Sequence, residues 1–155
     1  MIRYQNLQIL DYVLIDGKIR RIEAITKRKV GYHIKPEDQL HYARLQDIFP
    51  IKITEELLLK LGFWKSPKYK NIFECRDYQP KFPYEWSATY AIGDGTLLLS
   101  RTRTYDPMLG ADHPENNTIF PFASCTIVVT HLHELQHAFR LCGIKFEIKL
   151  KNNLE

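Results

Sequence analysis

Residues 10–25 read LDYVLIDGKIRRIEAI, and this stretch decides the fold of the N-terminal part of the chain. Asp16-Gly17 stands between two runs that are rich in β-forming residues. A two-residue hairpin turn needs positive φ at both of its positions, and Asp-Gly is a pair that accepts this conformation. The stretch therefore predicts a β-hairpin that turns at Asp16-Gly17.

Two more short strands are predicted after the hairpin, in KRKVGYHI (27–34) and QLHYARLQDI (39–48). No helical period occurs in this part of the chain, so the first 50 residues predict a small, strongly bent sheet of the SH3-like barrel kind. A short helix follows at 54–61, because Thr54 can cap it and Gly62 can take the left-handed position that ends it.

The rest of the chain predicts a second, antiparallel sheet. Residues 63–105 are rich in aromatic residues and interrupted by Pro and Gly, which favours strands near 71–77, 84–92 and 96–104. The segment YDPMLGADHPENNT (105–118) has the turn residues of a long loop. Apolar residues then recur at helical spacing over about 127–142, and IKFEIKL (144–150) alternates as a final strand.

Together these patterns predict an α+β protein. We expect an SH3-like β subdomain over 1–50 and an α+β subdomain over 51–155, in which one amphipathic helix packs on the antiparallel sheet. The chain has no apolar run of the ~20 residues that cross a bilayer, and its start lacks signal-peptide features. We therefore expect a cytoplasmic protein with no membrane partner, whose three cysteines are reduced and mostly buried.

The charge is uneven along the chain. Residues 1–70 contain 14 Lys/Arg and 8 Asp/Glu, a net charge of +6, whereas residues 71–155 contain 8 and 10, a net charge of −2. A short N-terminal segment holds most of the excess, and such a cluster can bind nucleic-acid phosphates. Its candidate residues are Lys18, Arg20, Arg21, Lys27, Arg28 and Lys29. The alternative is a solvated hairpin edge that charge protects from aggregation.

The stretch HLHELQHAF (131–139) contains a match to the H-E-x-x-H signature of zinc hydrolases. In that interpretation His133 and His137 bind zinc from one helix face, and Glu134 is the general base. The extended signature does not supply a third ligand, because it needs Gly and His where this chain has Arg140 and Gly143. The remaining donors are His131, and His113 or Asp112 in the loop. The apolar period also predicts that both histidines face solvent. A helix without metal is therefore favoured, and zinc stays the alternative cofactor.

Three segments resemble successive blocks of a family of short uncharacterised proteins carried by Bacteroidota genomes, phages and mobile elements. They are LDYVLIDGKIRRIEAI, LQDIFPIKITEELLLKLGF (45–63) and HLHELQHAFRLCGIKFEI (131–148). The last block in that family reads roughly H-E-L-Q-N-L-Y-F-A-L-T-G, so His137 stands where an Asn is common. The resemblance implies an architecture and an origin, and it implies no catalytic residue.

These observations favour a non-catalytic binding or adaptor protein of a phage or mobile element, whose partner is nucleic acid or another protein. One alternative is a zinc-dependent hydrolase that uses His133, Glu134 and His137. A second is a protein that sequesters a small molecule. The sequence does not indicate the oligomeric state.

Overall fold

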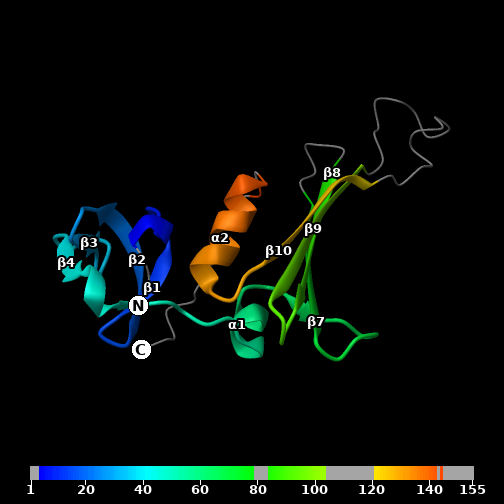
Figure 1. Cartoon of the computed structure of the whole chain (residues 1–155), viewed down its shortest axis with the longest axis horizontal. Helices are drawn as coiled ribbons and strands as arrows, with labels where there is room; N and C mark the ends of the chain where they lie inside the picture. Colours follow the sequence, from blue (N-terminus) through cyan, green and yellow to red (C-terminus); the bar gives the residue numbers. More distant parts are fainter. Residues whose placement is uncertain (1–3, 79–83, 104–120, 143, 145–155) are drawn as a thin grey trace. The chain divides into compact units, whose positions relative to one another are not determined.

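The computed structural model describes residues 4–78, 84–103, 121–142 and 144 (Figure 1). These residues form an α+β fold with two five-stranded antiparallel sheets and two α-helices. The chain divides into two compact units: unit 1 runs to Ile53 and resumes at Thr130, and unit 2 is Thr54–Val129. Among the described residues, no helix is long and apolar enough to cross a membrane.

The sheet of unit 1 has the strand order β4-β3-β2-β1-β5. Its first hairpin turns where the sequence predicts it, with φ of 52° at Asp16 and 73° at Gly17. Both turn residues are in the left-handed region that a tight hairpin requires. The bounds are Tyr12–Ile15 for β1, Lys18–Ile25 for β2, Lys29–Tyr32 for β3, His41–Arg44 for β4 and Ile48–Phe49 for β5; short 3₁₀ turns η1 (Tyr4–Asn6) and η2 (Leu45–Asp47) accompany them.

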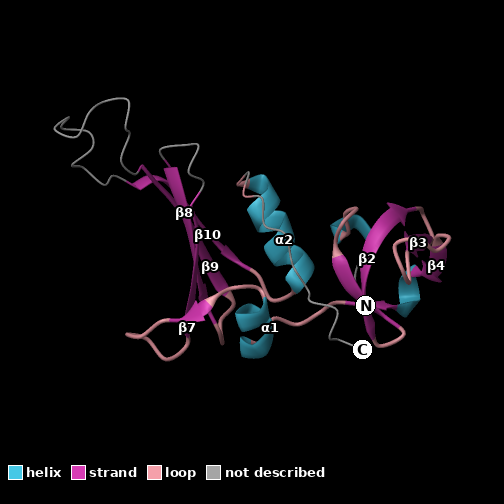
Figure 2. Cartoon of the chain, turned by 180° about the vertical axis from the view of Figure 1, so that it is seen from behind, coloured by secondary structure: helices cyan, strands magenta, loops and turns pink. Residues whose placement is uncertain are grey.

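This sheet curls into a half-barrel around a small apolar core (Figure 2). A β-bulge in β2, between Ile22 and Ala24, shifts the strand by one residue. Because a bulge changes which residues share a face, both Ile22 and Ile25 can pack on the core. The buried members of the core are Leu7, Val13, Ile15, Ile22, Val30, Ala43 and Ile48.

The C-terminal helix α2 (Leu132–Leu141) belongs to unit 1. The sequence prediction is correct about this helix and close to its end, but it is wrong about its start. Residues 127 and 128 belong to strand β10 (Pro121–Val128), which pairs with the preceding strand. An apolar run such as PFASCTIV suits a strand or a helix, and the backbone pairing decides between them.

The sheet of unit 2 has the order β10-β9-β8-β7-β6. Three of its strands lie where the aromatic-rich segment predicts them: β7 (Ile72–Tyr78), β8 (Tyr84–Ala91) and β9 (Thr96–Arg103). Strand β6 (Trp64–Lys65) is short, and helix α1 (Glu55–Lys60) precedes it. The hydroxyl oxygen of Thr54 caps α1 by accepting from the backbone N–H of Leu57 at 3.2 Å.

Several sequence predictions differ from the structure or lie outside the described residues. The contacts group α2 with unit 1, whereas the sequence prediction placed it within 51–155. The expectation of mostly buried cysteines is wrong, because Cys125 is exposed and Cys75 and Cys142 are only partly buried. Cys125 lies on the strand β10 that the sequence did not predict. The predicted loop at 105–118 and all of the predicted final strand 144–150 beyond Ile144 lie outside the described residues.

Candidate functional site

Glu134 caps the N-terminus of α2. His131 is the N-cap residue, and one carboxylate oxygen of Glu134 accepts from the backbone N–H groups of Thr130 at 2.7 Å and His131 at 3.0 Å. These donors would otherwise be unpaired at the helix N-terminus. Partial burial raises the pKa of Glu134, but the two backbone hydrogen bonds outweigh it, and the pKa lies below its ordinary value. Glu134 is therefore an ionised capping residue.

Gln136 joins α2 to the segment that leads into β1. Its side-chain N–H donates to the carbonyl of Leu10 at 3.0 Å, and its carbonyl oxygen accepts from the backbone N–H of Tyr12 at 3.0 Å. The amide therefore pairs with the backbone on both sides of Asp11. Leu10 itself has a φ of 73°, which is uncommon for a residue other than glycine. The buried amide of Gln136 helps to hold this turn.

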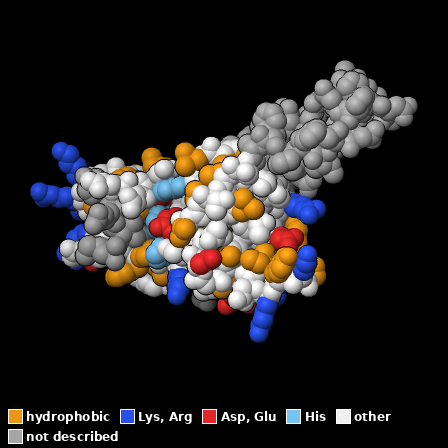
Figure 3. All heavy atoms as spheres, turned by 45° about the vertical axis from the view of Figure 1, so that its right-hand side comes forward, with side chains coloured by type: hydrophobic (Ala, Val, Ile, Leu, Met, Phe, Trp, Pro, Cys, Tyr) orange, Lys and Arg blue, Asp and Glu red, His pale blue; other side chains and the backbone are white. Residues whose placement is uncertain are grey.

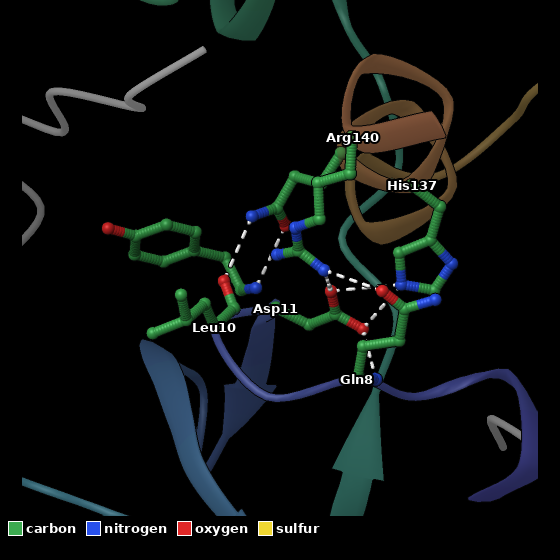
Figure 4. A network of polar contacts seen from close by, with 7 residues as sticks. Gln8, Leu10, Asp11, His137 and Arg140 are labelled. Carbon is green, nitrogen blue, oxygen red and sulfur yellow. Dashed lines mark hydrogen bonds and ion pairs between the residues drawn. The ribbon is translucent and has the colours of Figure 1, made fainter. Parts of the chain in front are cut away.

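Asp11 is the centre of the polar network between α2 and the N-terminal segment (Figure 4). Its side chain is fully buried, and both carboxylate oxygens lie within 3.0 Å of the Nε2 atom of His137. Arg140 donates to one oxygen at 2.9 Å, and the backbone N–H of Gln8 donates to the other at 2.7 Å. Since an ionised carboxylate only accepts, the proton of the contact with His137 is on Nε2. Paired and hydrogen-bonded in this way, a buried carboxylate is tolerated.

The structure corrects the predicted orientation of the two histidines of the motif. They were expected to face solvent, but His133 is only 3% exposed and the side chain of His137 is 19% exposed. The helical period locates the apolar stripe of α2 correctly, because Leu132, Leu135 and Phe139 are buried. It could not show that the polar side of the helix is covered too, by the segment that carries Asp11.

His133 is the least satisfied group of the site. Its ring lies 5.8 Å from the ring of His131 and 5.9 Å from the ring of His137, measured between centroids. Its Nδ1 atom is buried and has no hydrogen-bond partner among the described residues. Burial lowers the pKa of His133, because desolvation disfavours the charged imidazolium. The ring is therefore a neutral, buried group.

The described residues do not fit a catalytic zinc centre. They contain no group of three His, Cys, Asp or Glu side chains that could hold a metal ion. Glu134 is directed at the backbone of Thr130 and His131, just before the helix, and His137 is directed at Asp11. Two other donors that the sequence offers, Asp112 and His113, lie outside the described residues. Each polar residue of the motif except His133 thus has a structural partner within unit 1.

The six candidate cations of the N-terminal segment do not form one continuous edge. Arg20 and Arg21 are adjacent on β2, and adjacent residues of a strand point to opposite faces. Arg20 lies over the ring of Tyr32 at 5.9 Å, and Arg21 pairs with Glu23 at 2.7 Å. Lys18 is the first residue of β2 and is exposed. The remaining three, Lys27, Arg28 and Lys29, are consecutive and exposed where β2 turns into β3.

Sequence reasoning missed the residues that hold the site together. Arg140 pairs with Asp11, and Gln136 pairs with the backbone of Leu10 and Tyr12. Each of these contacts joins residues more than 120 positions apart, and no short motif connects them. One signal was present: Asp11 lies in the first of the segments that resemble a family, and Gln136 and Arg140 lie in the last. Comparison of the chain with protein-family models, with curated proteins and with solved structures found no match.

Proposed function

We propose that the chain is a non-catalytic binding protein of a phage or mobile element, and that unit 1 binds the phosphate backbone of nucleic acid. The observation that carries this proposal is the run Lys27-Arg28-Lys29 at the β2–β3 turn. All three residues are exposed, and none has an acidic partner among the described residues. Figure 3 shows Lys and Arg side chains (blue) projecting well beyond the surrounding surface.

Hydrogen bonds between Thr26 and Lys29 brace the backbone of this turn. The hydroxyl oxygen of Thr26 accepts from the backbone N–H of Lys29 at 3.0 Å, and the backbone N–H of Thr26 donates to the carbonyl of Lys29 at 2.9 Å. A fixed turn presents its side chains with little loss of backbone entropy on binding. Contacts from Lys and Arg to phosphate oxygens supply affinity that does not depend on base sequence.

The half-barrel of unit 1 supports the finer fold assignment in the same proposal. Five short antiparallel strands around one small core are typical of an SH3-like barrel. The proposal also includes membership of the Bacteroidota family that the three segments resemble, and a cytoplasmic location. Nothing in these features requires catalysis, since the buried polar groups of α2 are engaged in holding unit 1 together.

Two alternatives stay open with less support. The zinc-dependent hydrolase is favoured by one observation, the neighbouring rings of His133 and His137 with an unpartnered Nδ1 on His133. The engagement of Glu134 and His137 opposes it. Metal analysis of protein purified without a His tag tests it, since one tightly held zinc per chain would overturn the binding-protein proposal. Sequestration of a small molecule has no described feature in its favour.

The nucleic-acid proposal is tested by titrating labelled single- and double-stranded DNA and RNA at two salt concentrations. The test variant replaces Lys27, Arg28 and Lys29 by Gln. A matched control replaces three other exposed lysines by Gln and so removes the same charge; they are Lys52, Lys68 and Lys70.

The test variant should bind all sequences more weakly, and its salt dependence should flatten by about 0.7–0.9 per lost contact. The control should bind nearly as the wild type does. If the wild type binds no nucleic acid with a Kd below about 100 μM at low salt, the nucleic-acid proposal is rejected and a protein partner is left.

A further inference from the structure

Within the part of the chain that the structure describes, the two sheets have four edge strands, and three of them carry features that discourage pairing with another chain. Strand β4 has four residues, including His41 and Arg44. Strands β5 and β6 have two residues each, and β6 contains Lys65, which pairs with Glu55 at 3.0 Å. Short length and charge are the usual protection of a sheet edge. Strand β10 differs, because it has eight residues, PFASCTIV, and no charged side chain. Its Pro121 and its bulge between Pro121 and Ala123 lie at one end, so the segment Ser124–Val128 carries neither of these edge protections.

The backbone of β10 offers a regular row of hydrogen-bonding groups on its outer side. The N–H of Val129 donates to the carbonyl of Gly95 at 2.9 Å, and the same register continues along β10 and β9. In an antiparallel pair, alternate residues direct their backbone groups to the same neighbour. Ile127 and Cys125 therefore face β9, whereas the N–H and C=O groups of three exposed residues, Ser124, Thr126 and Val128, point away from the sheet. These groups have no backbone partner among the described residues.

The core face of the sheet is also less covered at this edge. Leu97 and Leu99 on β9 are at most 1% exposed. Their partners on β10 share that face, yet Ile127 is only partly buried and Cys125 is exposed. The layer that buries β9 therefore covers this part of β10 less completely. An additional strand beside β10 would extend both the hydrogen bonding and the cover.

We propose that a second copy of this chain pairs with β10 through its own β10, antiparallel, about a twofold axis. The strand complements itself. With Thr126 opposite Thr126 of the other copy, Ser124 lies opposite Val128, and every outward N–H and C=O of the three residues is paired. In this register Cys125 faces Ile127 of the second copy, so core face continues into core face. No charge opposes the contact, and cross-strand Thr pairs are favourable.

The result is a twofold dimer with one continuous sheet formed by unit 2 of both copies. The interface is isologous, so each copy uses the same β10 edge and association stops at two. The opposite edge of the same sheet is the short strand β6 with Lys65, whose length and charge disfavour pairing with a third copy. The inference does not depend on the nucleic-acid proposal, because it involves none of the cations of unit 1.

The test measures the oligomeric state by sedimentation equilibrium over about 1–300 μM. Thr126→Pro removes an outward N–H and leaves the ladder with β9 intact, which an edge strand tolerates. Thr126→Lys adds the charge that edges usually carry. The control is Thr89→Lys, because Thr89 and Thr126 are the two cross-strand neighbours of Leu98 and share its face.

The wild type and Thr89→Lys should dimerise alike, and both Thr126 variants should raise the dimer Kd by at least about tenfold. A wild type that stays monomeric throughout, or that forms open-ended assemblies, would overturn the proposal. If both Thr126 variants dimerise as tightly as the wild type does, the proposal is overturned too.

Amide hydrogen exchange gives a second measurement that does not need a variant. In the dimer, the N–H groups of Ser124, Thr126 and Val128 should be protected, and dilution to monomer should release all three. The N–H groups of Cys125 and Ile127, which face β9, should stay protected at every concentration. If the protection of Ser124, Thr126 and Val128 does not fall on dilution, or if Cys125 and Ile127 lose protection with them, pairing through β10 is refuted.

Discussion

Replacing Asp11 by Asn should lower the free energy of unfolding of unit 1 by about 2–4 kcal/mol. The Asn side chain keeps the volume but replaces one acceptor oxygen by an NH₂ group. That group then faces a donor, either the backbone N–H of Gln8 or the pair His137 and Arg140. A hydrogen bond to a charged group contributes about 1.5–3 kcal/mol, and the partial exposure of Arg140 lets water recover part of the loss.

The structure offers a matched control for burial. Asp47 accepts from Arg44 at 2.9 Å, the same distance as between Asp11 and Arg140, but both partners of this pair are exposed. Asp47→Asn should therefore cost less than about 1 kcal/mol. The two carboxylates differ in burial and in the number of donors, since Asp11 contacts Gln8, His137 and Arg140 and Asp47 pairs with Arg44.

Urea unfolding followed by far-UV circular dichroism measures both variants. Fluorescence is unsuitable, because Trp64 and Trp86 both belong to unit 2. Amide exchange at Tyr12 adds a local probe, since its N–H donates to Gln136 beside Asp11 and should exchange faster in Asp11→Asn. If Asp11→Asn costs no more than Asp47→Asn, the network does not hold α2 to the sheet, and the argument from buried pairing fails.

Three more predictions follow from single residues. Leu135→Ala should cost about 2–5 kcal/mol in urea unfolding, because the side chain is fully buried; a cost below about 1 kcal/mol would contradict the packing of α2. Gly17→Ala should cost about 1 kcal/mol from backbone strain at a φ of 73°, without changing the fold seen by circular dichroism; a neutral result would contradict the left-handed turn. Burial lowers the pKa of His133, so between that value and about 6.5 the unfolded chain binds more protons. The contribution of His133 to stability is thus complete above about pH 6.5 and is lost as the pH falls through the folded-state pKa; His133→Gln should flatten this loss, and parallel pH curves would contradict it.

Local chemistry in the sequence was enough to predict several elements. Asp16-Gly17 predicts its hairpin because few residue pairs accept positive φ twice in succession, and the structure confirms it. Thr54 marks the start of α1 through a hydrogen bond made three residues away. The strands β7, β8 and β9 were predicted because turn residues separate them. In each case the cause and the effect lie within a few positions of the chain.

The surroundings of the H-E-x-x-H match were decided by tertiary structure. The sequence determined the apolar stripe of α2, but the partner of its polar side, Asp11, lies 126 positions before His137. Strand β10 shows the same dependence, since its apolar run becomes a strand through hydrogen bonds to β9. Periodicity measures which residues share a face of one element, whereas burial and pairing depend on what another element places against that face. The chain therefore determined its turns and caps locally, and only the assembled fold decided that His133 is buried and that His137 is largely covered.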